Sequence, residues 1–410
     1  MFSRVLTICA PEVFGRSVPG MNTSPTVFAQ VMARLPHWEF QRLQRAHATT
    51  PSRRGALSPW DHFLALAFAQ LTFRESLRDI EACLAAQAGL AYHMGFRARI
   101  TRSTLARANE QRDWRPLAAW AQKLMPRARA LYRDEPTALD LDAPVYAVDS
   151  TLIDLSLALC PWANWTGGAA AVKLHTALDL RGPLPAFLHV TPATHGDVLW
   201  LDELPIEPGA FYVLDRGYVD FRRLRRIAEG GAFFVIRERP DVRYYVAVSR
   251  PVDRTTKLRS DQSIRLNGAV APGHWPGLLR RVSIFDAEHS RRLAFWTNHW
   301  QLSAALIAEL YRQRWQVELF FRWLKHGLRI RLFYGTSPNA VRQQLWAAIC
   351  TYLALAITRK QLGITTNLTT FVQVLSLHAI AKVPVKSLFA DYATSPAPQS
   401  SGDQLLINDL

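Results

Sequence analysis

The pattern of strands between Pro144 and Glu238 constrains the fold of this 410-residue chain more than any other feature. Three apolar, β-branched segments separated by short turns predict three successive strands. They are PVYAVDSTLIDL (144–155), AVKLHTALDL (171–180) and LPAFLHVTPA (184–193). A short helix near 197–204, a buried strand in 209–221 that ends at Asp215, a basic helix over 221–229 and a strand over 232–238 follow. Strands that first pair directly and then alternate with helices predict an α/β protein with a mixed sheet flanked by helices.

The order of these elements, with a later helix, is that of the ribonuclease-H-like fold, although periodicity alone supports only the broader α/β class. We expect this fold over 140–238 and 301–362. Between the two parts, residues 239–300 lose helical periodicity and form short alternating segments, which predicts a β-rich insertion. Residues 1–135 predict an α-helical N-terminal domain, and 363–410 a C-terminal segment whose polar tail from about 393 is expected to be disordered.

The charge balance points to a polyanionic partner. Forty-nine Lys and Arg against thirty-three Asp and Glu give a net charge of +16 and an isoelectric point near 10.2. The basic residues run along the whole chain, so nucleic acid is the first partner to consider, and a basic soluble enzyme is the alternative. The four cysteines are far apart and form no CxxC pair, so they suggest neither a zinc site nor a disulfide framework.

Several local signals refine the helical regions. Ser58 followed by Pro59 predicts a helix start, after a loop over 49–58. Residues 97–115 join a basic turn to a helix capped by Thr101 or Ser103, and form either a helix-turn-helix-like DNA reader or a solvated arginine face. The apolar run Leu345–Ile357 is shorter than the roughly 20 residues that cross a bilayer, so we expect a buried core helix and no membrane insertion.

Three acids stand out by their positions. Asp149 and Asp215 each end a buried apolar run, and Glu318 lies on the helix after the insertion, which we expect to run from Ser303 to about Gly327. An acid at the end of a buried strand is costly unless it is compensated, and neighbouring strand ends bring such acids together. Carboxylate clusters bind Mg²⁺ or Mn²⁺, and two ions can promote an in-line phosphoryl displacement. The alternative for each acid taken singly is a turn cap or a salt bridge.

The helix that carries Glu318 presents further polar groups on one face. At about 100° per residue, Tyr311, Arg314, Glu318 and Lys325 fall within an arc of roughly 60°. Arg314 can clamp a phosphate with two donors, and Lys325 supplies a mobile charge. Trp315, Phe320 and Trp323 lie on other faces and are expected to pack in the core.

These residues carry a resemblance. The spacing Tyr-x2-Arg-x3-Glu-x6-Lys resembles the signature of bacterial DDE transposases of insertion-sequence family four, and AVDST and LDRGYVD are similar to that family's first two acid motifs. The resemblance covers about 27–360. It implies that Asp149, Asp215 and Glu318 bind the metal, with Tyr311, Arg314 and Lys325 at the DNA end. It also implies cut-and-paste transposition dependent on Mg²⁺, without a covalent enzyme intermediate and without a membrane partner.

The resemblance further implies double-stranded DNA partners, namely terminal inverted repeats and target DNA, and a homodimer in the synaptic complex. We expect two Mg²⁺ ions, which Mn²⁺ can replace, a cytoplasmic location with nucleoid association on DNA, and DNA-end binding by residues 1–135. A hairpin on the transposon end is a further expectation. A related nuclease that does not transpose, and a non-catalytic DNA-binding protein, are the alternatives.

The remaining polar residues near the predicted sheet have weaker signals. Arg216 and Lys173 are either phosphate contacts or surface charges, and His175 and His195 are expected to be packed rather than metal-binding. The spacing passes over three other acids, Asp154, Asp179 and Asp197. Two tryptophans of the insertion, Trp296 and Trp300, are weak choices for stacking on a flipped base. G-x-S-x-G, Walker A and H-E-x-x-H motifs are absent from the sequence.

Overall fold

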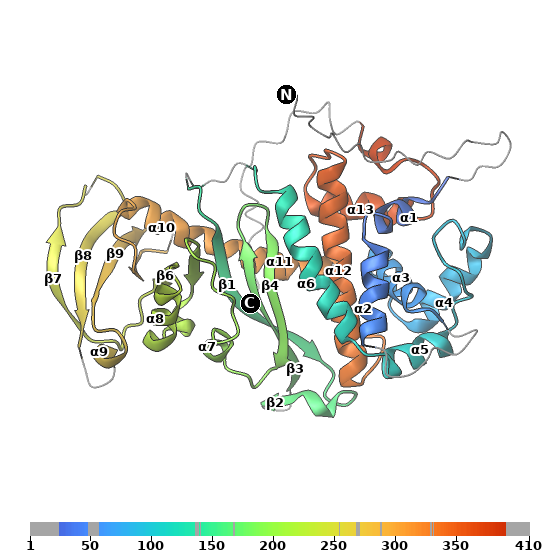
Figure 1. The fold of residues 1–410 in the computed structure, drawn as a ribbon, viewed down its shortest axis with the longest axis horizontal. Helices are drawn as coiled ribbons and strands as arrows, with labels where there is room; N and C mark the ends of the chain where they lie inside the picture. The colour runs from blue at the N-terminus through green and yellow to red at the C-terminus, as the bar shows by residue number, and fades with distance from the viewer. Residues whose placement is uncertain are drawn as a thin grey trace, which may run out of the picture.

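A computed structural model gives the arrangement of the chain. It describes residues 24–47, 57–135, 139, 141–166, 169–253, 255–267, 271–287, 289–328, 330 and 332–390. Most of the loop predicted over 49–58 and the whole tail from 393 lie outside the described residues. Within the described part, ten strands form one mixed sheet, and helices cover both of its faces (Figure 1). The predicted α/β class is confirmed.

The sheet places the two predicted strand acids. Its strands are β1 (Val145–Leu155), β2 (Asn164–Thr166), β3 (Ala169–Asp179), β4 (Leu184–Pro192), β5 (Phe211–Leu214), β6 (Phe233–Arg237), β7 (Tyr244–Arg250), β8 (Leu258–Leu266), β9 (Leu278–Asp286) and β10 (Arg291–Thr297). Their order is β2-β3-β1-β5-β6-β10-β9-β8-β7, and β4 also pairs with β3. β1 is antiparallel to β3 and parallel to β5, so it is a central strand with partners on both sides.

The insertion is rich in strands, as predicted, and its strands continue the sheet formed by β1 to β6. β7 to β10 and the short α9 (Ala271–His274) occupy this region. β10 pairs antiparallel with β6, where Trp296 lies opposite Ile236. The insertion therefore extends the same sheet away from the helical part of the molecule (Figure 1).

The N-terminal region is helical. Its helices are α1 (Val27–Met32), α2 (His37–Ala46), α3 (Pro59–Leu71), α4 (Leu77–Ala86), η1 (Ala88–Leu90), α5 (Arg102–Gln111) and α6 (Arg115–Leu131). The Ser58 hydroxyl caps α3 by accepting from the Asp61 amide, and Thr101 rather than Ser103 caps α5. The Arg112 guanidinium, at the end of α5, donates inward to the carbonyl oxygens of Leu57 and Ser58. DNA reading by residues 97–115 stays a prediction.

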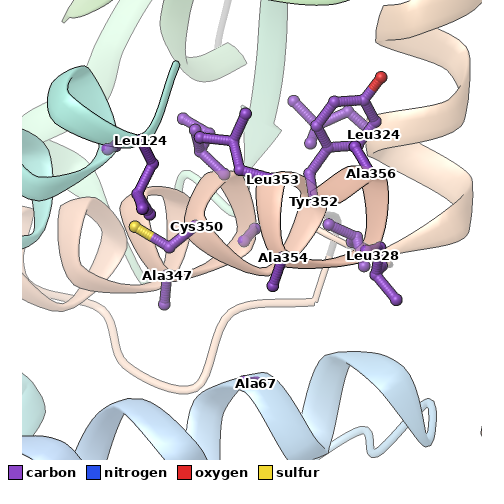
Figure 2. Close-up of a cluster of buried hydrophobic side chains, with 14 of the residues drawn as sticks. Ala67, Leu124, Leu324, Leu328, Ala347, Cys350, Tyr352, Leu353, Ala354 and Ala356 are labelled. Carbon is purple, nitrogen blue, oxygen red and sulfur yellow. The ribbon is translucent and has the colours of Figure 1, made fainter. Parts of the chain in front are cut away.

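The central helix of the core is α12 (Pro338–Gln361). It is long and apolar enough to cross a membrane, but 94% of its apolar window is buried inside the protein, so the predicted core helix is confirmed. Figure 2 shows Cys350 and Leu353 of α12 among Leu124 of α6 and residues of the helix that carries Glu318. One buried cluster joins α3, α6, α12 and one face of the sheet. The division of the chain into domains stays a prediction.

The helix predicted from Ser303 to about Gly327 has its predicted extent, since residues 304–327 are helical, but it contains one 3-10 turn. It consists of α10 (Ala304–Arg312), the 3-10 turn η4 (Gln313–Trp315) and α11 (Gln316–Gly327). The other helical elements are η2 (Pro161–Ala163), α7 (Asp197–Trp200), η3 (Arg216–Tyr218), α8 (Phe221–Glu229), α13 (Leu368–His378) and η5 (Val385–Phe389). Tyr311 thus lies in α10, Arg314 in η4, and Glu318 and Lys325 in α11. The arc of roughly 60° calculated for a regular α-helix therefore does not apply across the 3-10 turn.

Candidate active site

Asp149 and Asp215 lie side by side because of the register of two parallel strands. Val148 of β1 pairs with Leu214 of β5, so the next residues in register are Asp149 and Asp215. Asp215 directly follows β5, as predicted. Asp149 does not end its strand, since β1 continues to Leu155, and that part of the prediction is wrong.

The side of the sheet that Asp149 faces is the one covered by α11. Side chains alternate between the two faces of a strand, and Val145 and Ala147 of β1 belong to the same buried cluster as Val317 of α11. Tyr146 and Val148 belong to a separate cluster on the other side. The same alternation directs Asp149 toward the α11 side, where Glu318 lies in the first turn of the helix.

Tyr311 connects α10 to the second acid. Its hydroxyl donates to Asp215 Oδ1 at 3.0 Å. Its ring packs against Phe295 of β10, with ring centroids 4.5 Å apart. Because β10 belongs to the insertion, this contact gives the insertion a direct part in supporting the residues around Asp215.

Arg314 connects the first acid to the third. Its guanidinium donates to Asp149 Oδ2 at 3.0 Å and to Glu318 Oε1 at 2.6 Å. The Arg314 side chain is only 14% exposed, whereas the Glu318 side chain is 50% exposed. The structure therefore brings Tyr311, Arg314 and all three predicted acids into one cluster, despite the break at η4.

Burial and like charges perturb the groups of this cluster. Burial raises the pKa of Asp149 to about 6; the Arg314 charge and the Ser150 amide oppose this, and the carboxylates of Glu318 and Asp215 add to it. Burial and the Asp215 charge raise the pKa of Tyr311 to about 12. Although burial opposes it, the charges of Asp149, Tyr311 and Glu318 raise the pKa of Arg314 above its usual value. Asp149 and Glu318 share the one guanidinium and Asp215 adds a further negative charge near Asp149, so the site is short of positive charge.

The chemistry of the cluster fits a divalent cation. No group of three or more His, Cys, Asp or Glu side chains in the described residues is arranged to hold a metal ion as it stands. Arg314 lies between Asp149 and Glu318, and so takes the place of a cation between them. The donors are carboxylate oxygens, which Mg²⁺ and similar ions prefer. The oxygen atoms of Asp149, Asp215 and Glu318 would therefore suit such an ion if the guanidinium were displaced.

The other residues predicted to contact DNA lie in different environments. Arg216 is exposed in η3, directly after Asp215, and Lys325 is partly exposed near the end of α11. Lys173 is only 12% exposed and lies 3.0 Å from Asp197 Oδ1. Its ammonium also donates to the carbonyl oxygen of His195 at 2.8 Å. These contacts engage the charge of Lys173 within the protein.

The aromatic predictions need two corrections. Trp296 is fully buried and packs on Phe221, so it is not a stacking platform for a flipped base. Trp315, in η4, was expected in the core but is 42% exposed. Phe320 is buried, as expected, and Trp300 is 43% exposed.

Sequence reasoning missed a hydrogen bond between Ser150 and Asp197 on the face of the sheet opposite Asp149. The Ser150 hydroxyl donates to Asp197 Oδ1 at 2.7 Å. His175 is packed, as expected: its ring stacks on Trp200 and its Nε2 lies 2.9 Å from Thr191 Oγ1. The sequence did hold a signal for polar residues on this face. Ser150 directly follows Asp149, so its side chain points to the opposite face, and the predicted strand order places β3 beside β1 there.

Comparison with known proteins decides the family. Residues 140–354, more than half of the chain, match the family described as Transposase DDE domain. The chain belongs to this family of DDE transposases. Residues 23–97 match a second family, described as Domain of unknown function (DUF4372). As a DDE transposase, the chain is an enzyme of DNA transposition, and the family implies DNA binding and dependence on divalent metal ions.

Three relatives carry transposase names. The protein y4zB of Sinorhizobium fredii is 35% identical over 62% of this chain and 70% of its own length. The transposase for insertion sequence element IS5377 of Geobacillus stearothermophilus is 31% identical over 59% and 64%. The one for element IS4SA of Synechocystis sp. is 24% identical over 62% and 71%. These relatives support an insertion-sequence transposase.

A solved structure is similar over much of its length. It is the cryo-EM structure of the piggyBac transposase synaptic complex with hairpin DNA, at 9% identity. The match covers 91% of this chain and 81% of that chain, with a TM-score of 0.41. That score is too low to establish a common fold.

Proposed function

We propose that this DDE transposase hydrolyses the phosphodiester at each end of an insertion sequence and joins the freed 3′-hydroxyl to target DNA. Asp149, Asp215 and Glu318 are the proposed ligands of two Mg²⁺ ions, which Mn²⁺ can replace. The observation that carries the proposal is the convergence of the three acids, two through strand register and the third through Arg314. Assignment to insertion-sequence family four is part of the same proposal.

The residues around the acids have distinct proposed roles. Bound ions would activate the attacking oxygen and stabilise the leaving oxygen. Tyr311 orients the Asp215 carboxylate through its hydrogen bond. Arg314, once released from Asp149, can hold a phosphate with two parallel hydrogen bonds. Arg216 and Lys325 supply further positive charge to the DNA backbone. Lys173 is omitted from the phosphate contacts, because its ammonium is paired with Asp197.

The DNA and the assembly are also proposed. The net charge of +16 supports binding to double-stranded DNA, here the terminal inverted repeats and the target. Two ends must be held together, so we propose a homodimer in the synaptic complex. We propose a cytoplasmic location, with nucleoid association on DNA.

The test is a cleavage and strand-transfer assay with terminal-repeat DNA and Mg²⁺. Asp149→Ala, Asp215→Ala and Glu318→Gln should each abolish cleavage. Matched controls are Asp154→Ala, an exposed acid on the same strand, and Glu309→Gln, an acid of α10 paired with Arg312. Cleavage that persists in the three site variants contradicts the assignment. Cleavage by the unmodified chain without strand transfer favours the nuclease alternative.

A further inference from the structure

A group of polar side chains lies on the face of the sheet opposite the candidate active site. Ser150 follows Asp149 on β1, so their side chains point to opposite faces. On the Ser150 side, β3 places His175 directly opposite Ser150, with Lys173 two residues away on the same face. Asp197 reaches these residues from α7. Buried polar groups are costly to place, so this arrangement requires a reason.

Asp197 is the centre of the group. Its Oδ1 accepts from the Ser150 hydroxyl at 2.7 Å and lies 3.0 Å from Lys173 Nζ. The Nδ1 atom of His175 is 3.9 Å from the same oxygen. Lys173 also holds the backbone carbonyl of His195, two residues before Asp197. Lys173 therefore fixes the segment from His195 to Asp197, at the start of α7, to β3 at two points.

Ser150 links this group to the catalytic face. Its hydroxyl is held by Asp197, and its backbone amide donates to Asp149 Oδ1 at 2.8 Å. The pairing with β5 ends at Val148 and Leu214, one residue before Asp149. Beyond that pair, the described partner of β1 is β3 alone. Asp197 and Ser150 thus supply support where the parallel ladder stops.

We propose that Asp197 is a positioning residue of the transposase, which acts through Ser150 to orient the Asp149 carboxylate and so sets the affinity of the site for divalent ions. This inference rests on the proposed role of Asp149 as a metal ligand. Asp197 does not itself bind the ion, because it lies on the other face of the sheet. Outer partners of metal ligands typically change metal affinity by about 10- to 100-fold.

The test compares four variants of the full chain. Ser150→Ala removes the hydroxyl, Ser150→Thr retains it, and Asp197→Ala removes its acceptor. Asp202→Ala is the matched control, because this half-exposed acid lies close in sequence but pairs with Arg223 of α8. The measurements are Mn²⁺ affinity of the DNA-free chain by electron paramagnetic resonance, cleavage rate and thermal unfolding.

Ser150→Ala and Asp197→Ala should weaken Mn²⁺ binding about tenfold or more, while Ser150→Thr retains it. Asp202→Ala should leave Mn²⁺ affinity unchanged even where it lowers the melting temperature. Wild-type affinity in both alanine variants, or an equal loss in Asp202→Ala, overturns the inference. A wild-type chain that binds no Mn²⁺ and cuts no DNA instead overturns the proposed function.

Discussion

Asp149 and Asp215 belong to neighbouring strands of one ladder, whereas Glu318 belongs to a helix that begins after the break at η4. The strand acids are partly buried and placed by backbone register. The Glu318 side chain is 50% exposed and is linked to Asp149 through one guanidinium. The sheet side of the site is thus fixed by the fold, and the helix side is adjustable. The two sides should respond differently to the same kind of change.

The largest expected difference is in tolerance to a change of side-chain length. Asp149→Glu should reduce DNA cleavage by about 10³-fold or more, because this partly buried side chain on a register-fixed backbone cannot shift to accept an extra methylene. Glu318→Asp should lose only about 10- to 100-fold, because its half-exposed side chain and helix can adjust. Single-turnover cleavage rates measure both. Equal losses would show that the two sides are equally rigid.

A second difference concerns stability and pH. Folding raises the pKa of Asp149 from 3.8 to about 6, so its ionised form destabilises the folded chain. This destabilisation is absent below about pH 4, grows between about pH 4 and pH 6, and stays at its full size at higher pH. Asp149→Asn should therefore stabilise the metal-free chain at pH 7 by about 1–3 kcal/mol and have little effect at pH 4.

Chemical denaturation across this pH range measures the free energy of unfolding. Glu318→Gln is the control on the helix side, and removal of this half-exposed carboxylate should change stability by less than about 0.5 kcal/mol. A stability of Asp149→Asn that runs parallel to wild type at every pH contradicts the prediction.

A third prediction concerns the link between the two sides. Arg314→Gln removes the cation between Asp149 and Glu318, so Mn²⁺ should bind the DNA-free chain about tenfold more tightly, or about 1.4 kcal/mol, at pH 8. Arg314→Lys retains the charge and should bind Mn²⁺ nearly as wild type does. Titration with Mn²⁺ measures both. Weaker binding by Arg314→Gln would mean that the guanidinium organises the acids rather than competing with the ion.

The smallest effect is expected at Tyr311. Tyr311→Phe retains the packing on Phe295 but removes the donor to Asp215 Oδ1. The loss of one hydrogen bond of about 1 kcal/mol should slow cleavage by roughly tenfold or less. A loss as large as that of Asp215→Ala would show that the hydroxyl takes part in the reaction itself.

The sequence was sufficient to predict the strand side of the site but not its details. Apolar runs and turns are local signals, so the sequence was sufficient to locate the strands. The predicted strand order then implied that Asp149 and Asp215 lie close together. The break at Gln313–Trp315 could not be predicted, since a single 3-10 turn barely alters helical periodicity. The pairing of β10 with β6 and the contacts of Arg314 and Asp197 depend on residues far apart in the sequence, which single-sequence patterns do not specify.

The shared core around α12 has a genetic consequence. α12 packs in the centre of the helical N-terminal region, where Cys350 and Leu353 of α12 and Leu124 of α6 belong to one buried cluster (Figure 2). A copy of the gene cut short by a frameshift before residue 338 would leave α3 and α6 with an exposed apolar surface. Such fragments should be removed by proteolysis, so they would not persist as inhibitors that compete for the ends of intact elements.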